Sequence, residues 1–187
     1  MEKSVIALIG PSGSGKSSIG KRLAAILNWE FLDTDREIER ISSKTVAQIF
    51  ELEGEQEFRR KERELLDDLA SVGRKELVLS TGGGFPVFGN NWEKLEALAT
   101  VVYLTAPLEV LVTRVNTGEQ RPLLAGSAEH GQAEVLAQTK AKLGKLITER
   151  ESIYNRARYR IDTSSASAVH LSFDIIRLTG LVIPPSR

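Results

Sequence analysis

VIALIGPSGSGKS, residues 5–17, is the stretch of this chain that decides its fold. Its first five residues form a continuous apolar run, which is typical of a parallel strand buried on both faces. Gly10 to Ser17 match the P-loop pattern G-x4-G-K-[ST], in which glycines let backbone N–H groups face phosphate oxygens at the start of a helix. Apolar residues then recur at helical spacing as far as Leu27. We therefore expect a strand, a phosphate-binding loop and a helix, in that order.

The loop predicts specific nucleotide contacts. Lys16 is expected to reach the β- and γ-phosphates, and the Ser17 hydroxyl is expected to bind Mg²⁺. The alternative is a glycine-rich turn with a surface lysine, but the strand before the loop and the helix after it favour the P-loop. By itself the pattern does not separate a kinase from a hydrolase, a switch or a motor. The predicted nucleotide-binding residues of this loop are Gly13, Ser14, Gly15, Lys16, Ser17 and Ser18.

Beyond the loop, short apolar runs alternate with helical patterns along the chain. This alternation predicts an α/β fold of three layers, with helices on both faces of a parallel sheet. Residues 116–133 lack any periodicity, and we expect a long functional loop there. Further strands are predicted at 30–32, 77–79, 101–104 and 159–161, and further helices at 36–41, 46–52, 55–69, 92–98, 108–115, 133–155 and 168–178.

The totals fit a single domain of 187 residues, 41% hydrophobic and 27% charged. Lys plus Arg and Asp plus Glu both number 25, so the basic excess typical of a nucleic-acid binder is absent. The chain has no cysteine, which excludes disulfides, thiolate metal sites and cysteine nucleophiles and suits a reducing compartment. Its apolar runs are too short for a signal peptide or a membrane span. We expect a cytoplasmic protein without nucleic-acid or membrane partners.

Asp33-Thr34-Asp35 directly follows a predicted strand. In an extended chain the two carboxylates, two residues apart, lie on the same side. One could hold Mg²⁺ through water while the other accepts a hydrogen bond from a substrate hydroxyl, as phosphoryl transfer to an alcohol requires. The alternative is that Asp35 caps the next helix. Because ligands bind at the carboxyl ends of parallel strands, these residues are expected near the P-loop.

A carboxylate and an arginine share one face of the helix predicted over 55–69. Phe58, Leu65 and Leu69 form an apolar stripe, and Glu62 falls on it, three residues after Arg59. A carboxylate that orients an arginine on an apolar face indicates an anchored guanidinium able to bind an anion. An exposed salt bridge of little energetic value is the alternative.

Three other segments carry candidate binding groups. Arg150 lies along the apolar face of the long helix, where it either extends to solvent or grips a carboxylate. Gly82, Gly83 and Gly84 follow a buried strand; they form either a plain turn or a site where the backbone approaches a ligand. Arg121 lies in the long loop, with Arg114 before it, and this loop is either a lid that closes over ATP or a mobile surface loop.

Together these features resemble the shikimate kinase family, in order and in spacing, over about residues 5–163. The resemblance implies transfer of the ATP γ-phosphoryl group to the 3-hydroxyl of shikimate. It also implies a P-loop kinase core with a five-stranded parallel sheet, a helical substrate-binding segment at about 33–62 and a mobile lid at about 116–131. The motifs that carry it are the P-loop at 10–17, Asp33-Thr34-Asp35, Gly54-Glu55 with Phe58-Arg59 and Glu62, Ser80-Thr81-Gly82-Gly83-Gly84, Arg121-Pro122-Leu123-Leu124, and Arg150 with Tyr154.

The resemblance also implies a role for each residue that would bind shikimate, the acceptor, or ATP, the donor. Asp35 would contact the acceptor hydroxyl and act as base. Shikimate would be held by Arg59, Arg150 and the glycines 82–84. Lys16 and Arg121 would stabilise the transferring phosphoryl group, Ser17 and Asp33 would organise Mg²⁺, and Arg114 and Arg121 would contribute to the nucleotide site. We expect a monomer that binds ATP and shikimate.

Three other functions fit this set of motifs less well. Gluconate kinase shares a similar P-loop and also needs a grip on a carboxylate, but the triple glycine and Phe58-Arg59 favour shikimate. A nucleoside monophosphate kinase would need a base-reading pocket, which the sequence does not reveal. A non-catalytic ATP-binding module is expected to lack Asp35 or the loop arginine, and this chain has both.

Overall fold

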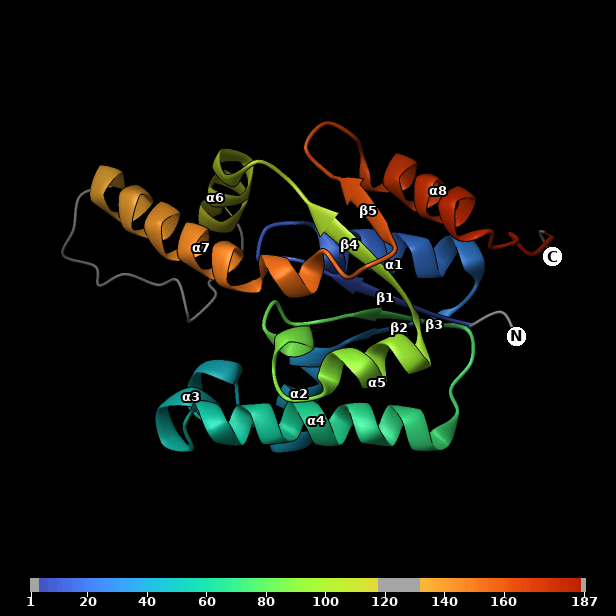
Figure 1. The fold of residues 1–187 in the computed structure, drawn as a ribbon, viewed down its shortest axis with the longest axis horizontal. Coiled ribbons are helices and arrows are strands. Elements are labelled where there is room, and N and C mark those ends of the chain that lie inside the picture. The colour runs from blue at the N-terminus through green and yellow to red at the C-terminus, as the bar shows by residue number, and fades with distance from the viewer. Residues whose placement is uncertain (1–3, 118–131, 186–187) are drawn as a thin grey trace.

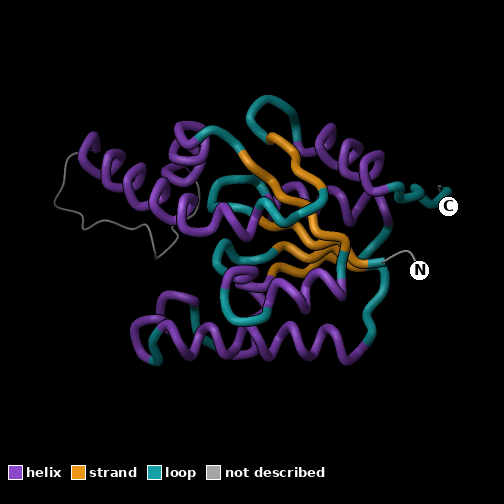
Figure 2. The backbone as a smooth tube through the Cα atoms, viewed as in Figure 1, coloured by secondary structure: helices purple, strands orange, loops and turns teal. Residues whose placement is uncertain are grey.

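A five-stranded parallel sheet forms the centre of the protein in a computed structural model that describes residues 4–117 and 132–185. Every strand pair is parallel. Figure 2 shows the strands side by side with helices on either side. The sheet order is β2-β3-β1-β4-β5, and the strands are β1 (Val5–Ile9), β2 (Glu30–Asp33), β3 (Leu77–Ser80), β4 (Thr100–Thr105) and β5 (Tyr159–Asp162).

Helices cover both faces of this sheet (Figure 1). One face carries α1 (Lys16–Leu27) and α8 (Ala168–Thr179), and the other carries α4 (Glu55–Val72) and α5 (Asn91–Leu98). The predicted α/β fold with a three-layer arrangement and five parallel strands is therefore confirmed.

The central strand β1 shows why the sheet needs both layers. Val5, Ala7 and Ile9 pack into a core with residues of α4 and α5, whereas Ile6 and Leu8 pack into a core with α1 and α8. All five side chains are at most 2% exposed. Successive side chains of a strand point to opposite faces, so a continuous apolar run is stable only when both faces are covered.

The segment between β2 and α4 is helical. It holds α2 (Thr34–Ser42) and α3 (Val46–Leu52), and the side chain of Thr45 caps α3 in a capping box with Gln48. This matches the helix predicted over 46–52. A single 3-10 turn, Phe85–Val87, follows the three glycines after β3.

Two helices flank the residues that the structure does not describe. They are α6 (Leu108–Thr117) and α7 (Gln132–Tyr154), and Leu111, Val112 and Leu143 form a small core between them. No helix of the described residues is long and apolar enough to cross a membrane.

The loop predicted over 116–133 is wrong at both ends, since Asn116 and Thr117 belong to α6 and the first two residues of α7 are 132 and 133. At the first end the helix continues without an apolar pattern, and the side chains of its last two residues bond back to carbonyls of the preceding turn. Asn116 donates to the carbonyl of Val112, and the Thr117 hydroxyl donates to that of Thr113. The rest of the predicted lid, 118–131, including Arg121, lies outside the described residues.

Candidate active site

A cleft of about 1210 Å³ opens at the carboxyl ends of the strands, between the P-loop and the helices α2, α4 and α7. The described residues that the sequence assigns to a site all line it, although they come from six separate segments of the chain. Arg121 lies outside the described residues. The predicted site residues in the cleft are Gly13, Ser14, Gly15, Lys16, Ser17, Ser18, Asp33, Asp35, Arg59, Gly82, Gly83, Gly84, Arg114 and Arg150.

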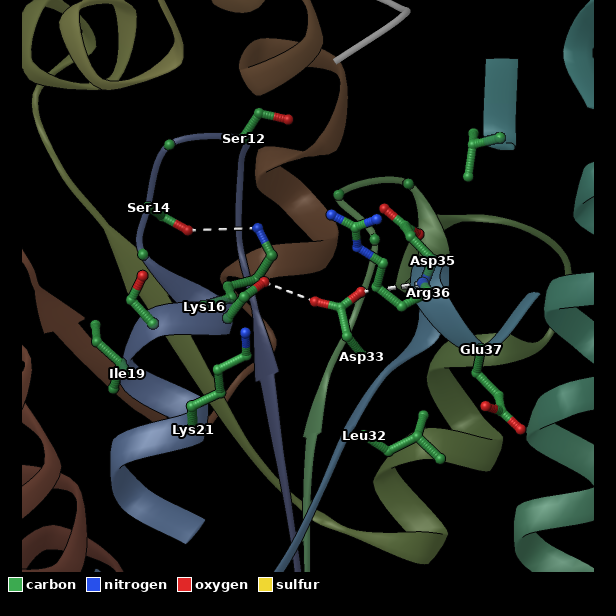
Figure 3. Close-up of a pocket in the computed structure, with 18 of the residues that line it drawn as sticks. Ser12, Ser14, Lys16, Ile19, Lys21, Leu32, Asp33, Asp35, Arg36 and Glu37 are labelled. Carbon is green, nitrogen blue, oxygen red and sulfur yellow. Dashed lines mark hydrogen bonds between the residues drawn. The ribbon is translucent and has the colours of Figure 1, made fainter. Parts of the chain in front are cut away.

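The P-loop joins β1 to α1. Gly13 and Gly15 have φ of 81° and 87°, a left-handed conformation that glycine adopts at no steric cost. Gly15 is the N-cap of α1, so the positive end of that helix faces the cleft. The ammonium of Lys16 donates to the carbonyls of Gly10 and Pro11, both at 2.8 Å, and lies beside Ser14 (Figure 3). A cation and a helix N-terminus thus share one concave loop, as anion binding requires.

A carboxylate and two hydroxyls meet beside the P-loop. The Ser17 hydroxyl donates to Oδ2 of Asp33 at 2.6 Å, and the Ser80 hydroxyl, from the end of β3, donates to the same oxygen at 3.2 Å. Figure 3 shows Asp33 facing the loop from the end of β2. Within the described residues no group of three or more His, Cys, Asp or Glu side chains could hold a metal ion.

Asp33 is also the N-cap of α2. Its Oδ1 accepts from the backbone N–H of Asp35 and Arg36, at 3.2 and 3.4 Å. The alternative that Asp35 caps the next helix is therefore wrong. Because Asp33 makes the cap, Asp35 lies inside the first turn of α2, and its carboxylate lies against Gly82.

Arg59 is held on three sides. Its Nη1 donates to Oε2 of Glu62 at 2.8 Å and its Nη2 to Oε1 of Glu55 at 2.9 Å, while the guanidinium carbon lies 3.9 Å from the ring centroid of Phe88. The Arg59 side chain is only 10% exposed and that of Glu62 is 0% exposed. The alternative of an exposed salt bridge is wrong, since this pair is buried.

Burial controls the protonation of Glu62. Loss of hydration raises the pKa of this carboxyl to about 7, and the charge of Arg59 opposes the rise. Among the described residues Oε1 of Glu62 has no hydrogen-bond partner, whereas Oε2 has Arg59. The carboxylate of Glu62 therefore binds Arg59 through one of its two oxygens, Oε2.

Arg150 and Tyr154 lie one turn apart on α7. Arg150 lines the cleft next to Gly83, so it extends towards the site, not along the outer surface. The Tyr154 hydroxyl donates to the Gly83 carbonyl at 2.6 Å, and its side chain is 0% exposed.

The three glycines make room for three different side chains. An ideal Cβ at Gly82 would lie 2.4 Å from Oδ1 of Asp35, and one at Gly84 would lie 2.8 Å from Nη1 of Arg59. At Gly83 the nearest atom is Nη1 of Arg150, at 3.3 Å. None of the three has a positive φ. Glycine is therefore needed here for close approach of neighbours, and these neighbours are the predicted acceptor-side residues.

Arg114 joins the P-loop to the end of β5. Its Nη2 donates to the Thr163 carbonyl at 2.7 Å, and its Nη1 donates to the Thr163 hydroxyl at 3.0 Å and to the Gly13 carbonyl at 3.4 Å. The predicted nucleotide-side arginine thus lies against the P-loop.

A family model described as shikimate kinase matches residues 12–178 of the chain. The chain belongs to the shikimate kinase family. This confirms the family that the sequence motifs resemble.

Shikimate kinases from several bacteria are similar along most of the chain. A shikimate kinase of Methylococcus capsulatus is 42% identical over 179 residues, which cover 94% of this chain and 93% of that protein. One from Pelotomaculum thermopropionicum is 40% identical over 162 residues, 87% of each. Among solved structures, shikimate kinase from Acinetobacter baumannii in complex with shikimate has a TM-score of 0.83 at 39% identity, covering 94% of this chain and 92% of that chain.

For this shikimate kinase family member, several side chains of the site received no role from the sequence. Phe88 stacks on Arg59, Ser80 bonds to Asp33, and Thr34 accepts a hydrogen bond from the backbone N–H of Gly82. Only Thr34 and Ser80 carried a signal, because each lies inside a motif that was singled out for other residues. Phe88 is separated from Arg59 by almost thirty positions, and nothing local links the two.

Proposed function

We propose that this protein transfers the γ-phosphoryl group of ATP to the 3-hydroxyl of shikimate. One observation carries the proposal: a single cleft joins Lys16 of the P-loop to Asp35, Arg59 and Arg150. A phosphate cradle at one end and a carboxylate with two arginines at the other suit a donor phosphate and an anionic alcohol. The membership of the shikimate kinase family and the likeness to a structure in complex with shikimate identify that alcohol.

On the acceptor side, Arg59 and Arg150 would bind the carboxylate of shikimate. Arg59 suits this role because Glu62, Glu55 and Phe88 already hold its guanidinium, so little side-chain freedom is lost on binding. Asp35 would accept a hydrogen bond from the 3-hydroxyl, orient its oxygen towards the phosphorus and take its proton as the new P–O bond forms.

On the donor side, Lys16 and the backbone of the P-loop would hold the phosphates, and Arg114 would support the loop through Gly13. Most of the catalysis of such a transfer comes from positioning and from charge stabilisation. Lys16 and Arg121 are proposed to neutralise the negative charge on the transferring group.

The oxygen ligands beside the P-loop fit Mg²⁺. Ser17 and Asp33, 2.6 Å apart, offer a hydroxyl and a carboxylate, and Mg²⁺ is usually held by one or two carboxylates together with substrate phosphates and water. When bound there, Mg²⁺ would neutralise phosphate charge. Asp33 holds Ser17 in place through their hydrogen bond and thereby keeps the hydroxyl directed towards the cleft.

The test is the rate of ADP formation from ATP and Mg²⁺ with shikimate, gluconate or AMP as separate acceptors. Wild type is compared with Asp35→Ala and with Asp68→Ala, which removes an exposed carboxylate from the outer surface of α4. We expect turnover with shikimate alone, a loss in Asp35→Ala of about a hundredfold or more, and wild-type rates in Asp68→Ala.

Turnover only with gluconate or AMP would overturn the proposed acceptor while leaving the phosphate loop in place. Unchanged turnover in Asp35→Ala would overturn the role of that carboxylate. ATP binding without turnover of any acceptor would favour a non-catalytic ATP-binding module.

We also propose that the protein acts in the cytoplasm as a monomer. The cysteine-free composition suits a reducing compartment. Of the large exposed apolar side chains of the described residues, Ile41, Leu52, Val72 and Leu136 lie on four different helices, and the others lie on α8 or directly after it. Cell fractionation and sedimentation of the purified protein test these two points.

A further inference from the structure

The turn that carries the three glycines is held by two hydroxyls from different helices. The backbone N–H of Gly82 donates to the hydroxyl oxygen of Thr34 at 2.9 Å. The hydroxyl of Tyr154 donates to the carbonyl of Gly83 at 2.6 Å. Thr34 and Tyr154 are both 0% exposed, so water does not replace either hydrogen bond.

Each of these hydroxyls belongs to a helix that also carries an acceptor-side charge. Thr34 directly precedes Asp35 in the first turn of α2, and Tyr154 lies one turn after Arg150 on α7. The hydrogen bonds therefore tie the two helices to one turn at different peptide groups, α2 through the N–H of Gly82 and α7 through the carbonyl of Gly83.

The turn lies in contact with both charges that the helices carry. Ideal Cβ positions at Gly82 and Gly83 would lie 2.4 Å from Asp35 and 3.3 Å from Arg150. With so little free space, a shift of the turn would displace these side chains, and a shift of either helix would displace the turn. A glycine turn has no side chains by which it could be held, so its position depends on its backbone hydrogen bonds.

We propose that Thr34 and Tyr154 are positioning residues of the acceptor site: their hydroxyls hold the glycine turn between α2 and α7 and so set Asp35 and Arg150 for the substrate. The inference rests on the proposed function, since it concerns the site for shikimate. It assigns neither residue a contact with shikimate or with ATP.

The first variants are Thr34→Val and Thr34→Ser. Valine has the shape of threonine but no acceptor for the N–H of Gly82, whereas serine keeps the oxygen. We expect Thr34→Val to raise the KM for shikimate about tenfold, as the loss of one buried hydrogen bond implies. The KM for ATP should stay within about twofold of wild type, and Thr34→Ser should restore the KM for shikimate.

Tyr154→Phe removes the hydroxyl by which α7 holds the same turn. This variant tests the positioning proposal even if Thr34→Val does not fold. It should also raise the KM for shikimate more than that for ATP. Because both hydroxyls hold one turn, the double variant should raise this KM by less than the product of the single effects. Thr179→Val is the control, since it removes a hydroxyl bonded within α8, near the amino-terminal ends of β4 and β5 and away from the cleft.

Amide hydrogen exchange of Gly82 supplies a readout that needs no substrate, and exchange should be faster in Thr34→Val than in wild type or Thr34→Ser. If wild type phosphorylates shikimate and the Val and Phe variants keep its KM within twofold, the positioning proposal is wrong and the proposed function stands. The same holds if both KM values rise together, or if serine fails to restore activity. A wild type that does not phosphorylate shikimate would instead overturn the proposed function, and with it the positioning role.

Discussion

Replacing Gly84 by alanine is expected to weaken shikimate binding by displacing Arg59. An ideal Cβ at position 84 would lie 2.8 Å from Nη1, 2.9 Å from Nη2 and 3.1 Å from Cζ of that arginine. Comfortable non-bonded contacts are about 3.5 Å or longer, so the guanidinium must retreat by about 0.7 Å. Glu62, Glu55 and the ring of Phe88 occupy its other sides and oppose the retreat.

The expected size of the effect follows from the hydrogen bonds that Arg59 is proposed to make with the substrate carboxylate. A hydrogen bond to a charged group contributes about 1.5–3 kcal/mol. Losing one of them corresponds to a rise in the KM for shikimate of about 10- to 150-fold. The KM for ATP should not change, because Arg59 lies on α4, away from the P-loop.

The assay is the initial rate as a function of shikimate concentration at saturating ATP. Gly144→Ala is the matched control, since an ideal Cβ there would meet only Cδ2 of Leu108 at an ordinary 3.4 Å. Gly83→Ala, at 3.3 Å from Arg150, should give an intermediate effect. A KM for shikimate in Gly84→Ala within twofold of wild type would refute the reasoning, as would an equal rise in Gly144→Ala.

Three more predictions follow from the same structure. Burial raises the pKa of Glu62 from 4.5 to about 7, so the folded protein holds this proton more tightly than the unfolded chain does. The free energy of unfolding should therefore fall by up to about 3 kcal/mol between pH 4.5 and pH 7, and urea unfolding of Glu62→Gln should lack that part of the fall. Lys16→Met should lower kcat at least about a hundredfold while calorimetry shows unchanged shikimate affinity; a normal kcat would remove Lys16 from the transfer step. Gly144→Ala should raise the free energy of unfolding by about 0.5–1 kcal/mol, since it removes a glycine from the interior of α7, and a lower thermal midpoint would contradict this.

Much of the fold was predictable because its signals are local. A continuous apolar run at 5–9, a glycine-rich turn and a helical pattern predicted β1, the P-loop and α1, and the structure has them there. The same alternation located the other four strands to within two residues at either end. The position of Glu62 on an apolar stripe predicted its pairing with Arg59, since residues three apart on a helix are neighbours.

The boundaries that failed were those where polar side chains, not apolar periodicity, extend or begin a helix. Asn116 and Thr117 form the end of α6, where their side chains bond back to its own carbonyls. Asp33 caps α2, so this helix begins at Thr34, two residues before the predicted start at 36. Hydrogen bonds of this kind depend on rotamers and backbone angles, which a hydrophobic pattern does not contain.

The sequence by itself determined the class of the fold, the phosphate loop and the acceptor-side residue types, because spacing along one strand or helix decides which side chains share a face. Only the tertiary structure decided how those segments meet. It buries Glu62, sets each of Gly82, Gly83 and Gly84 against a different charged side chain, and brings Thr34 and Tyr154 to one turn. These contacts join residues as much as 71 positions apart, and their distances depend on how the helices pack on the sheet.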